Sequence, residues 1–162
     1  SIVTALSRMV EEIKAEQPLV PEIKLDDIVI RSPLCDITFE KNPETIKKAQ
    51  TLREKILTDK GFLTITQSTN EITLIFPDTL RAQILSHFIV KPKVVLTNLV
   101  GISVRFSEAY IPVPNVVYTI IQSLAVKRIN IFEIVSTYTE ISIIVSQEEM
   151  KESLAALQRF FK

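Results

Sequence analysis

A pattern of twelve residues occurs twice in this chain, and no other feature of the sequence constrains the fold as strongly. Residues 65–76 return sixty-nine positions later as residues 134–145, and most of the exchanges between them are conservative. Four positions are identical in the two copies, namely Ile65 and Ile134, Glu71 and Glu140, Ile72 and Ile141, and Ile75 and Ile144. Self-similarity at one long period indicates that the chain holds two copies of a single folding unit.

Composition narrows the class of protein. With 46% apolar residues in 162, the chain has enough apolar side chains for a well-filled core in one domain or two small ones. The 19 basic residues are balanced by 19 acidic ones, so nucleic acid is not an expected partner of this chain alone. No apolar run is long enough to cross a membrane, and the N-terminus has neither a basic n-region nor a small-residue cleavage site. Because Cys35 is also the single cysteine, we expect a cytoplasmic protein without membrane contact.

The order of predicted elements is the same in both copies. Residues 1–22 are expected to form an N-terminal helix and linker, because apolar residues recur there at helical spacing before Pro18 and Pro21. Residues 23–92 and residues 93–162 then each read as strand, helix, strand, strand, helix. This order is typical of the ferredoxin-like unit, in which helices cover one face of an antiparallel sheet. We therefore predict an α+β protein with two tandem ferredoxin-like (β-α-β-β-α-β) units.

One strand of the second copy is apolar on both of its faces. Residues 143–145 read Ile-Ile-Val without interruption, whereas a strand with one exposed face would alternate apolar and polar residues. Such a strand needs cover on both sides, so we expect sheet-to-sheet or edge-to-edge pairing with another copy of the unit. The other half of the chain is one candidate, and a homodimer or higher homo-oligomer would supply more.

The second copy resembles the ACT domain family, and most specifically the C-terminal regulatory ACT domain of aspartokinases. In that family a helix ending in Leu-Ala leads to an Ile-Asn-Ile strand, a Ser/Thr-rich hairpin and a Glu-Ile-Ser strand. The corresponding residues here are 112–116, 120–125, 129–131, 134–137, 140–142 and 154–161. The resemblance covers residues 99–161 well, whereas residues 23–92 match only by pattern and by alignment to the second copy.

The resemblance implies units that pair side by side and bind a small effector, commonly an amino acid, where units meet. It also implies a ligand site formed by the loop before the first helix, the start of the second strand and the following hairpin. The candidate ligand-binding residues are Tyr110, Ile111, Pro112, Val113, Pro114, Asn115, Val116, Asn130, Ile131, Ser136 and Thr137. Free amides at a helix N-terminus attract a carboxylate, and an Asn side chain offers both a donor and an acceptor.

The two copies differ at this loop. The family usually has Gly after the proline, and here that position is Asn115, which can cap the following helix instead. The first copy departs further, because Glu44 in its loop would repel a ligand carboxylate. If one copy senses and the other serves as a scaffold, the second copy is the sensor.

The sequence favours a non-catalytic regulatory module of amino-acid metabolism whose effector is an amino acid. No phosphate-binding Gly-rich loop, nucleophile motif or metal-ligand spacing is present, so no cofactor, metal or catalytic residue is expected. Two alternatives remain open. The first alternative is a structural or oligomerisation module without a ligand. The second is the effector domain of a transcription regulator truncated at its N-terminus.

Overall fold

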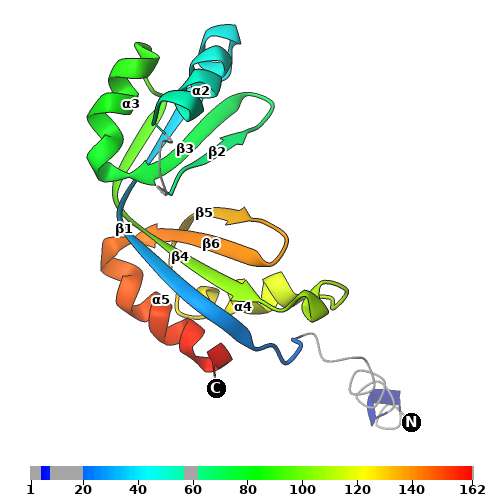
Figure 1. Cartoon of the computed structure of the whole chain (residues 1–162). Coiled ribbons are helices and arrows are strands. Elements are labelled where there is room, and N and C mark those ends of the chain that lie inside the picture. Colours follow the sequence, from blue (N-terminus) through cyan, green and yellow to red (C-terminus); the bar gives the residue numbers. More distant parts are fainter. Residues whose placement is uncertain (1–4, 8–19, 57–61, 162) are drawn as a thin grey trace.

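The chain folds into a single six-stranded antiparallel sheet with helices packed against it, an α+β architecture (Figure 1). The computed structural model describes residues 5–7, 20–56 and 62–161. The strands and α-helices, in chain order, are β1 (Leu25–Glu40), α2 (Pro43–Ile56), β2 (Thr64–Gln67), β3 (Glu71–Pro77), α3 (Arg81–Phe88), β4 (Val94–Phe106), α4 (Val116–Ala125), β5 (Ile131–Ser136), β6 (Glu140–Ser146) and α5 (Met150–Leu157).

The strand order is β2-β3-β1-β4-β6-β5, which places the two longest strands at the centre of the sheet. The two strands β1 and β4 pair with each other along most of their length. Beyond that, the C-terminal part of β1 pairs with β3, and the C-terminal part of β4 pairs with β6. Each central strand therefore belongs to both halves of the sheet.

The repeated pattern forms two hairpins, β2–β3 and β5–β6, with the same register. Ile65 lies opposite Leu74 in the first hairpin, and Ile134 lies opposite Ile143 at the equivalent position of the second. The turns also match, because Ser68 N donates to Glu71 O and Thr137 N donates to Glu140 O, each at 2.9 Å. The prediction of two hairpins from the repeat is thus confirmed at the level of individual pairs.

Two apolar clusters lie between the sheet and the helices. In the first half, α2 and α3 pack on β1 and β3, and the rings of Phe39 and Phe88 stack with centroids 4.1 Å apart. In the second half, α4 and α5 cover β4 and β6, with Ile120, Leu124 and Leu157 fully buried against the sheet. The helical stripes that the sequence predicts supply these side chains.

A third apolar cluster lies on the opposite face of the sheet, where the two halves meet. It consists of Leu34, Ile75, Leu99 and Ile144, all nearly inaccessible, with partly buried Phe62, Leu96 and Val135 around them. Ile75 and Ile144 are equivalent positions of the repeat. Figure 1 shows the two hairpins one above the other, extending to the same side of the curled sheet. The cover that the apolar strand at residues 143–145 requires therefore comes from the other half of the same chain.

The pairing of β1 with β4 is irregular beside this cluster. Its register shifts between Arg31 and Leu34 and again between Leu34 and Asp36, next to the cis peptide bond of Pro33. The sequence predicts a break or kink at Pro33, and the strand instead continues through it with these shifts. Gly101 lies opposite Arg31, and a Cβ atom there would lie 2.8 Å from Leu34 Cδ1 and 3.4 Å from Ile144 Cδ1. The glycine permits the close packing of β1 on β4.

A buried acid also faces this junction. Asp36 is 2% exposed and lies on β1 opposite Ile75 on one side and Leu96 on the other. Its burial, and secondarily the negative charge of Glu133 on β5, raise the pKa of Asp36 from its ordinary value of 3.8 to about 6. Burial and the charge of Glu71 likewise raise the pKa of Glu133. Acidic groups from three strands thus converge on the face where the halves meet.

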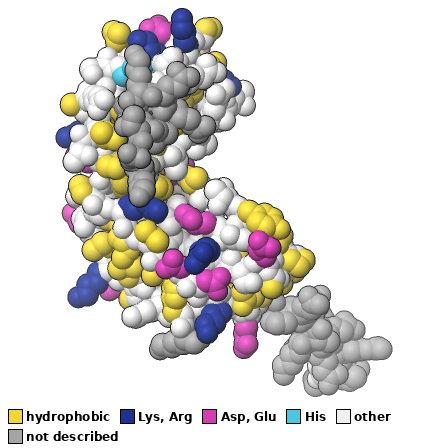
Figure 2. All heavy atoms as spheres, in the orientation of Figure 1, with side chains coloured by type: hydrophobic (Ala, Val, Ile, Leu, Met, Phe, Trp, Pro, Cys, Tyr) yellow, Lys and Arg dark blue, Asp and Glu magenta, His cyan; other side chains and the backbone are white. Residues whose placement is uncertain are grey.

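Parts of the sequence predictions lie outside the described residues. Of residues 1–22, expected to form an N-terminal helix and linker, the structure describes Ala5–Ser7, which are helical, and residues 20–22, which belong to no helix or strand. The predicted end of α2 near residues 60–61 also falls outside the description. No helix in the described part of the chain is long and apolar enough to span a membrane. On the face seen in Figure 2, acidic and basic side chains are interspersed rather than gathered by sign.

Replacing Gly101 with alanine should destabilise the protein, because Leu34 and Ile144 are buried and have little room to move. We expect Gly101→Ala to lower the free energy of unfolding by about 1–3 kcal/mol in urea titrations. Thr97→Ala on the exposed part of β4 is the control and should change it by less than about 0.5 kcal/mol. Equal midpoints for wild type and Gly101→Ala would show that the contact is relieved without cost.

The raised pKa of Asp36 predicts that its contribution to stability declines as the pH rises. Between pH 3.8 and about 6 the folded protein keeps a proton that the unfolded chain has released, so unfolding releases a proton and higher pH favours it. The Asp36→Asn variant has no titratable group at this position, so this pH dependence is absent from it. Its advantage over wild type in free energy of unfolding should grow by up to about 3 kcal/mol between pH 4 and pH 7.

Urea titrations across that pH range measure this difference. Thr97→Ala on β4 is the control, because it replaces no titratable group, and its difference from wild type should stay flat. A difference between Asp36→Asn and wild type that does not depend on pH would contradict the assignment.

Candidate functional site

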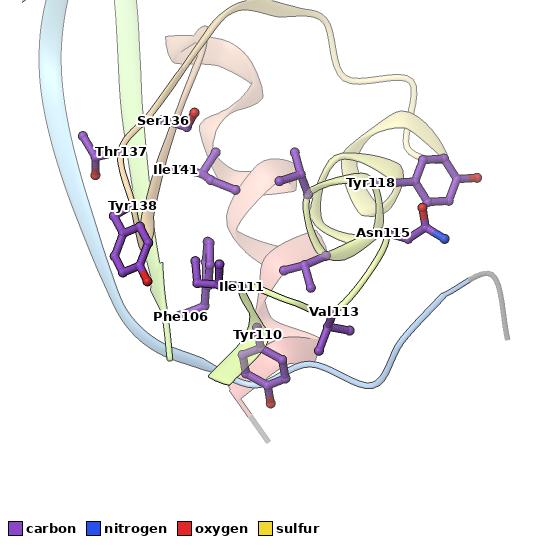
Figure 3. Close-up of a pocket in the computed structure, with 12 residues that line it drawn as sticks. Phe106, Tyr110, Ile111, Val113, Asn115, Tyr118, Ser136, Thr137, Tyr138 and Ile141 are labelled. Atoms are coloured by element: carbon purple, nitrogen blue, oxygen red, sulfur yellow. The ribbon is translucent and has the colours of Figure 1, made fainter. Parts of the chain in front are cut away.

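A cavity of about 420 Å³ lies between the start of α4, the loop that precedes it and the turn of the β5–β6 hairpin (Figure 3). Its volume falls in the range of small-molecule sites. The lining residues are Phe106, Tyr110, Ile111, Val113, Asn115, Val116, Val117, Tyr118, Ser136, Thr137, Tyr138 and Ile141. Figure 3 shows Thr137 and Tyr138 on one side and Asn115 and Tyr118 on the other, with apolar side chains between them.

The loop of residues 107–115 is held by short-range hydrogen bonds. Ser107 Oγ accepts from Ala109 N at 3.2 Å, which starts a 3₁₀ turn over Glu108–Tyr110. Val113 N then donates to Tyr110 O at 3.0 Å, and Pro112 and Pro114 further restrict the backbone. Tyr110 Oη accepts from Lys24 N at 3.0 Å, so its ring is fixed between the loop and the segment before β1. This wall of the cavity is thereby preorganised.

Asn115 ends the loop in a left-handed conformation, with φ 67° and ψ 13°. The expectation that its side chain caps α4 is wrong, because that side chain makes no capping hydrogen bond. A residue whose side chain caps a helix normally has an extended backbone conformation, whereas the backbone of Asn115 is left-handed. Asn is among the few residues that adopt this conformation readily. Asn115 therefore adopts a left-handed conformation that glycine also adopts readily, and it lines the cavity.

The first turn of α4 faces the same space. Thr119 N is the first amide of the helix to donate within it, to Asn115 O at 2.8 Å. The amides of Val116, Val117 and Tyr118 precede it and have no i−4 carbonyl inside the helix. All three residues line the cavity. Amides in this position carry the partial positive charge of the helix N-terminus and attract an anionic group.

The inner wall is apolar and the rim is polar. Phe106, Val116 and Ile141 are between 1% and 6% exposed, so they form a firm floor that continues into the core of the second half. Ser136 and Thr137 at the end of the β5–β6 hairpin are exposed and lie at the rim. The arrangement suits a ligand with a polar head at the rim and an apolar body on the floor.

The structure brings together seven of the eleven residues that the sequence marks as candidates: Tyr110, Ile111, Val113, Asn115, Val116, Ser136 and Thr137. Pro112 and Pro114 belong to the same loop but do not line the cavity. Asn130 and Ile131 lie at the opposite end of β5 from Ser136. There, Asn130 N donates to Glu149 Oε1 at 3.0 Å, and Ile131 packs against the apolar cluster of the second half.

Five lining residues do not appear among the sequence candidates: Phe106, Val117, Tyr118, Tyr138 and Ile141. Two of them had a sequence signal. Tyr118 lies in the first turn of the predicted helix, and Tyr138 directly follows the candidates Ser136 and Thr137. Phe106 and Ile141 are core residues by pattern, and only the three-dimensional structure shows that they also line the cavity.

The corresponding region of the first half is spanned by hydrogen bonds. Only residues 41–42 connect β1 to α2, and Asn42 Oδ1 accepts from Thr45 N at 2.9 Å, so Asn42 caps the helix. Lys41 reaches the β2–β3 turn twice, through N to Asn70 O and through Nζ to Ser68 O, each at 2.8 Å. The short connection thus holds the start of the helix against the hairpin turn. In the second half, the longer loop lies beside an open cavity.

Residues 95–159 match the family model of the ACT domain. The similarity to the ACT domain therefore covers most of the second half of the chain. The whole cavity, from Phe106 to Ile141, lies within the matched residues. No curated protein matches the sequence.

Solved structures extend the similarity over most of the chain. Aspartate kinase from Clostridium acetobutylicum superposes with a TM-score of 0.71 at 12% identity, over 91% of this chain and 36% of that one. The ligand-free regulatory subunit of aspartate kinase from Thermus thermophilus gives 0.66 at 15% identity, over 88% of this chain and 100% of that one.

A further similar structure is Escherichia coli aspartokinase III in complex with lysine and aspartate, in its T-state. It gives a TM-score of 0.64 at 12% identity, over 86% of this chain and 34% of that one. This chain therefore spans about a third of the length of the two whole kinases, and at these identities the likeness shows the ACT-like fold alone.

The left-handed conformation of Asn115 predicts a specific order of stability among variants. Asn115→Ala should lower the free energy of unfolding by about 1–2 kcal/mol, because a Cβ-bearing residue without a polar side chain is disfavoured at φ 67°. Asn115→Gly should be the more stable of the two, since glycine has no such penalty. Urea unfolding of both variants measures the difference. Equal midpoints would mean that the loop relaxes into another conformation.

Proposed function

We propose that this chain is a regulatory module that binds a free amino acid in the cavity before α4 and has no catalytic activity of its own. The observation that carries the proposal is the lining of the cavity and its position within the residues that match the ACT domain. The lining combines the free amides of a helix N-terminus, the Asn115 side chain and the hydroxyls of Ser136 and Thr137 with an apolar floor. The similarity to a regulatory subunit of aspartate kinase supports the same reading.

The ligand fits in one orientation. Its carboxylate is placed at the amides of Val116, Val117 and Tyr118, where the helix dipole favours negative charge. Its ammonium group is placed toward Asn115 Oδ1, an acceptor beside the start of α4, and the hydroxyls of Ser136 and Thr137 lie across the cavity from it. No lining residue from the described part of the chain is a Cys, His, Asp, Glu or Lys, the groups most used as nucleophile or general base. The lining supports binding rather than catalysis.

The regulatory unit is proposed to be a tandem pair of ferredoxin-like units within residues 23–92 and 93–162. In this division each unit takes its fourth strand from the other segment. The N-terminal part of β4 pairs with residues 34–38 of β1, and the N-terminal part of β1 pairs with residues 101–106 of β4. The units are interlocked, so a movement of one is transmitted to the other through shared strands.

A route for the signal leads from the cavity through the β5–β6 hairpin. Ser136 and Thr137 are at its turn, and the neighbouring Val135 packs on the third apolar cluster with Ile144. That cluster also contains Ile75 and Leu34 of the first half. A ligand that holds the turn against α4 therefore favours one placement of the two halves, which is the differential contact that allostery requires.

An assembly role is the second candidate, and exposed apolar residues on an edge strand favour it. Strand β5 ends the sheet, and its Phe132 and Ile134 are 38% and 44% exposed. An unpaired edge with apolar side chains is a typical site of strand pairing between copies. We propose a homodimer or higher homo-oligomer formed at this edge. Assembly without any ligand would be the result if the cavity binds nothing.

Calorimetric titration of the protein with each of the twenty amino acids tests the function. We expect at least one to bind, and to bind about three- to ten-fold more weakly to Asn115→Gly, which keeps the backbone conformation but lacks the side-chain amide. Asn130→Ala is the control, because Asn130 does not line the cavity, and its affinity should equal that of wild type. Neither heat nor a thermal shift with any amino acid would refute the proposal.

A further inference from the structure

Resting on the proposed function, we infer that the cavity selects an amino acid with an uncharged, apolar side chain and rejects lysine and the other charged amino acids. The lining contains several apolar and aromatic residues but, among the described residues, no Asp, Glu, Lys, Arg or His. A charged ligand side chain would therefore enter a space that offers it no partner of opposite charge.

The polar groups beside the start of α4 are assigned to the backbone groups of the ligand. Asn115 and the first amides of α4 lie on one side of the cavity, where the carboxylate and the ammonium group of the ligand are placed, whereas Ser136, Thr137 and the lining tyrosines offer only uncharged hydroxyls. Beyond them the side chain of the ligand meets Phe106 and Ile141, which are 6% and 1% exposed. This wall cannot accept or donate a hydrogen bond through its side chains.

The acidic residues nearest along the chain do not contribute a charge to the lining of the cavity. Glu140 directly precedes Ile141, but it borders a separate hollow together with Asp27 and Arg105 on the other side of the sheet. Glu108 lies in the loop and is exposed, and it is not part of the lining. Alternation along β6 explains the first case, since neighbouring residues of a strand face opposite sides.

Physical chemistry then determines the selectivity. An ammonium or carboxylate group moved from water to an apolar wall without a partner loses its hydration, whereas a methylene or methyl group gains from the same transfer. The same cavity therefore strengthens the binding of an apolar side chain and weakens that of a charged one. The inference separates this chain from Escherichia coli aspartokinase III, whose structure holds lysine.

Two ligands isolate the effect, because L-norleucine and L-lysine share the same four-carbon side chain and differ in the terminal ammonium group. Calorimetric titration of the whole chain with each should show norleucine binding at least ten-fold more tightly. L-Phenylalanine, L-leucine and L-methionine should bind, and L-arginine, L-aspartate and L-glutamate should not. If lysine binds as tightly as norleucine or more tightly, this inference is wrong while the proposed function stands. If no amino acid binds, both are refuted.

A pair of variants at Ile111 tests the physical cause. Ile111 lines the cavity and is 42% exposed, so polar replacements there should be tolerated by the fold. Ile111→Glu places a carboxylate beside the ligand side chain, and Ile111→Gln has nearly the same shape without the charge. Relative to Ile111→Gln, the Ile111→Glu variant should shift the ratio of lysine to norleucine affinity at least ten-fold toward lysine. An unchanged ratio in variants with native circular dichroism spectra would contradict selection by charge.

Discussion

The pairing of β1 with β4 is the interaction on which the rest of this structure depends. Both strands run through the whole sheet, so every other element is attached to one of them or to a hairpin that pairs with them. The pairing is tight where Gly101 lies close to Leu34, and it is irregular just beside that point. Because backbone hydrogen bonds and side-chain packing must both be satisfied there, the relative position of the two halves is set at this junction.

The two halves share one framework and differ in the connection before the first helix. In the first half, residues 41–42 connect strand and helix, and Lys41 bridges to the hairpin turn. In the second half, residues 107–115 form a 3₁₀ turn and end in the left-handed Asn115. Because the hairpin registers are the same in the two halves, this connection is a main structural difference between them.

The sequence predicted the parts of the fold that follow from short-range patterns. Both hairpins, with their turns, follow from the repeat, and α2 follows from the Asn42 cap and its apolar stripe. The ACT resemblance located the loop and hairpin turn of the cavity. In contrast, the conformation of Asn115 depends on backbone angles that residue identity allows but does not require. Asn130 lies at the other end of β5 from the cavity, so its role as a ligand-binding residue stays a prediction.

The sequence predicts that residues 143–145 are covered on both faces, but it does not predict which residues of the third apolar cluster cover them, because these contacts are long-range. The continuous run at residues 143–145 requires apolar contacts on both faces, yet nothing local says that Ile75, Leu34 and Leu99 supply them. Those residues meet Ile144 because the sheet curls, which is a property of the whole strand arrangement.

The third cluster is also small enough for ligand binding to influence it. Fully burying one such side chain stabilises by about 1.5–3 kcal/mol, and the charge of Asp36 beside the cluster opposes burial by a similar amount. Typical allosteric coupling free energies of about 1–3 kcal/mol lie on the same scale. Under the proposed function, a ligand that holds the hairpin turn would act on a cluster whose packing energy is of this size, whereas the cores under the helices contain many more buried side chains. We therefore propose the face that joins the halves as the place where a ligand would change the packing of the chain.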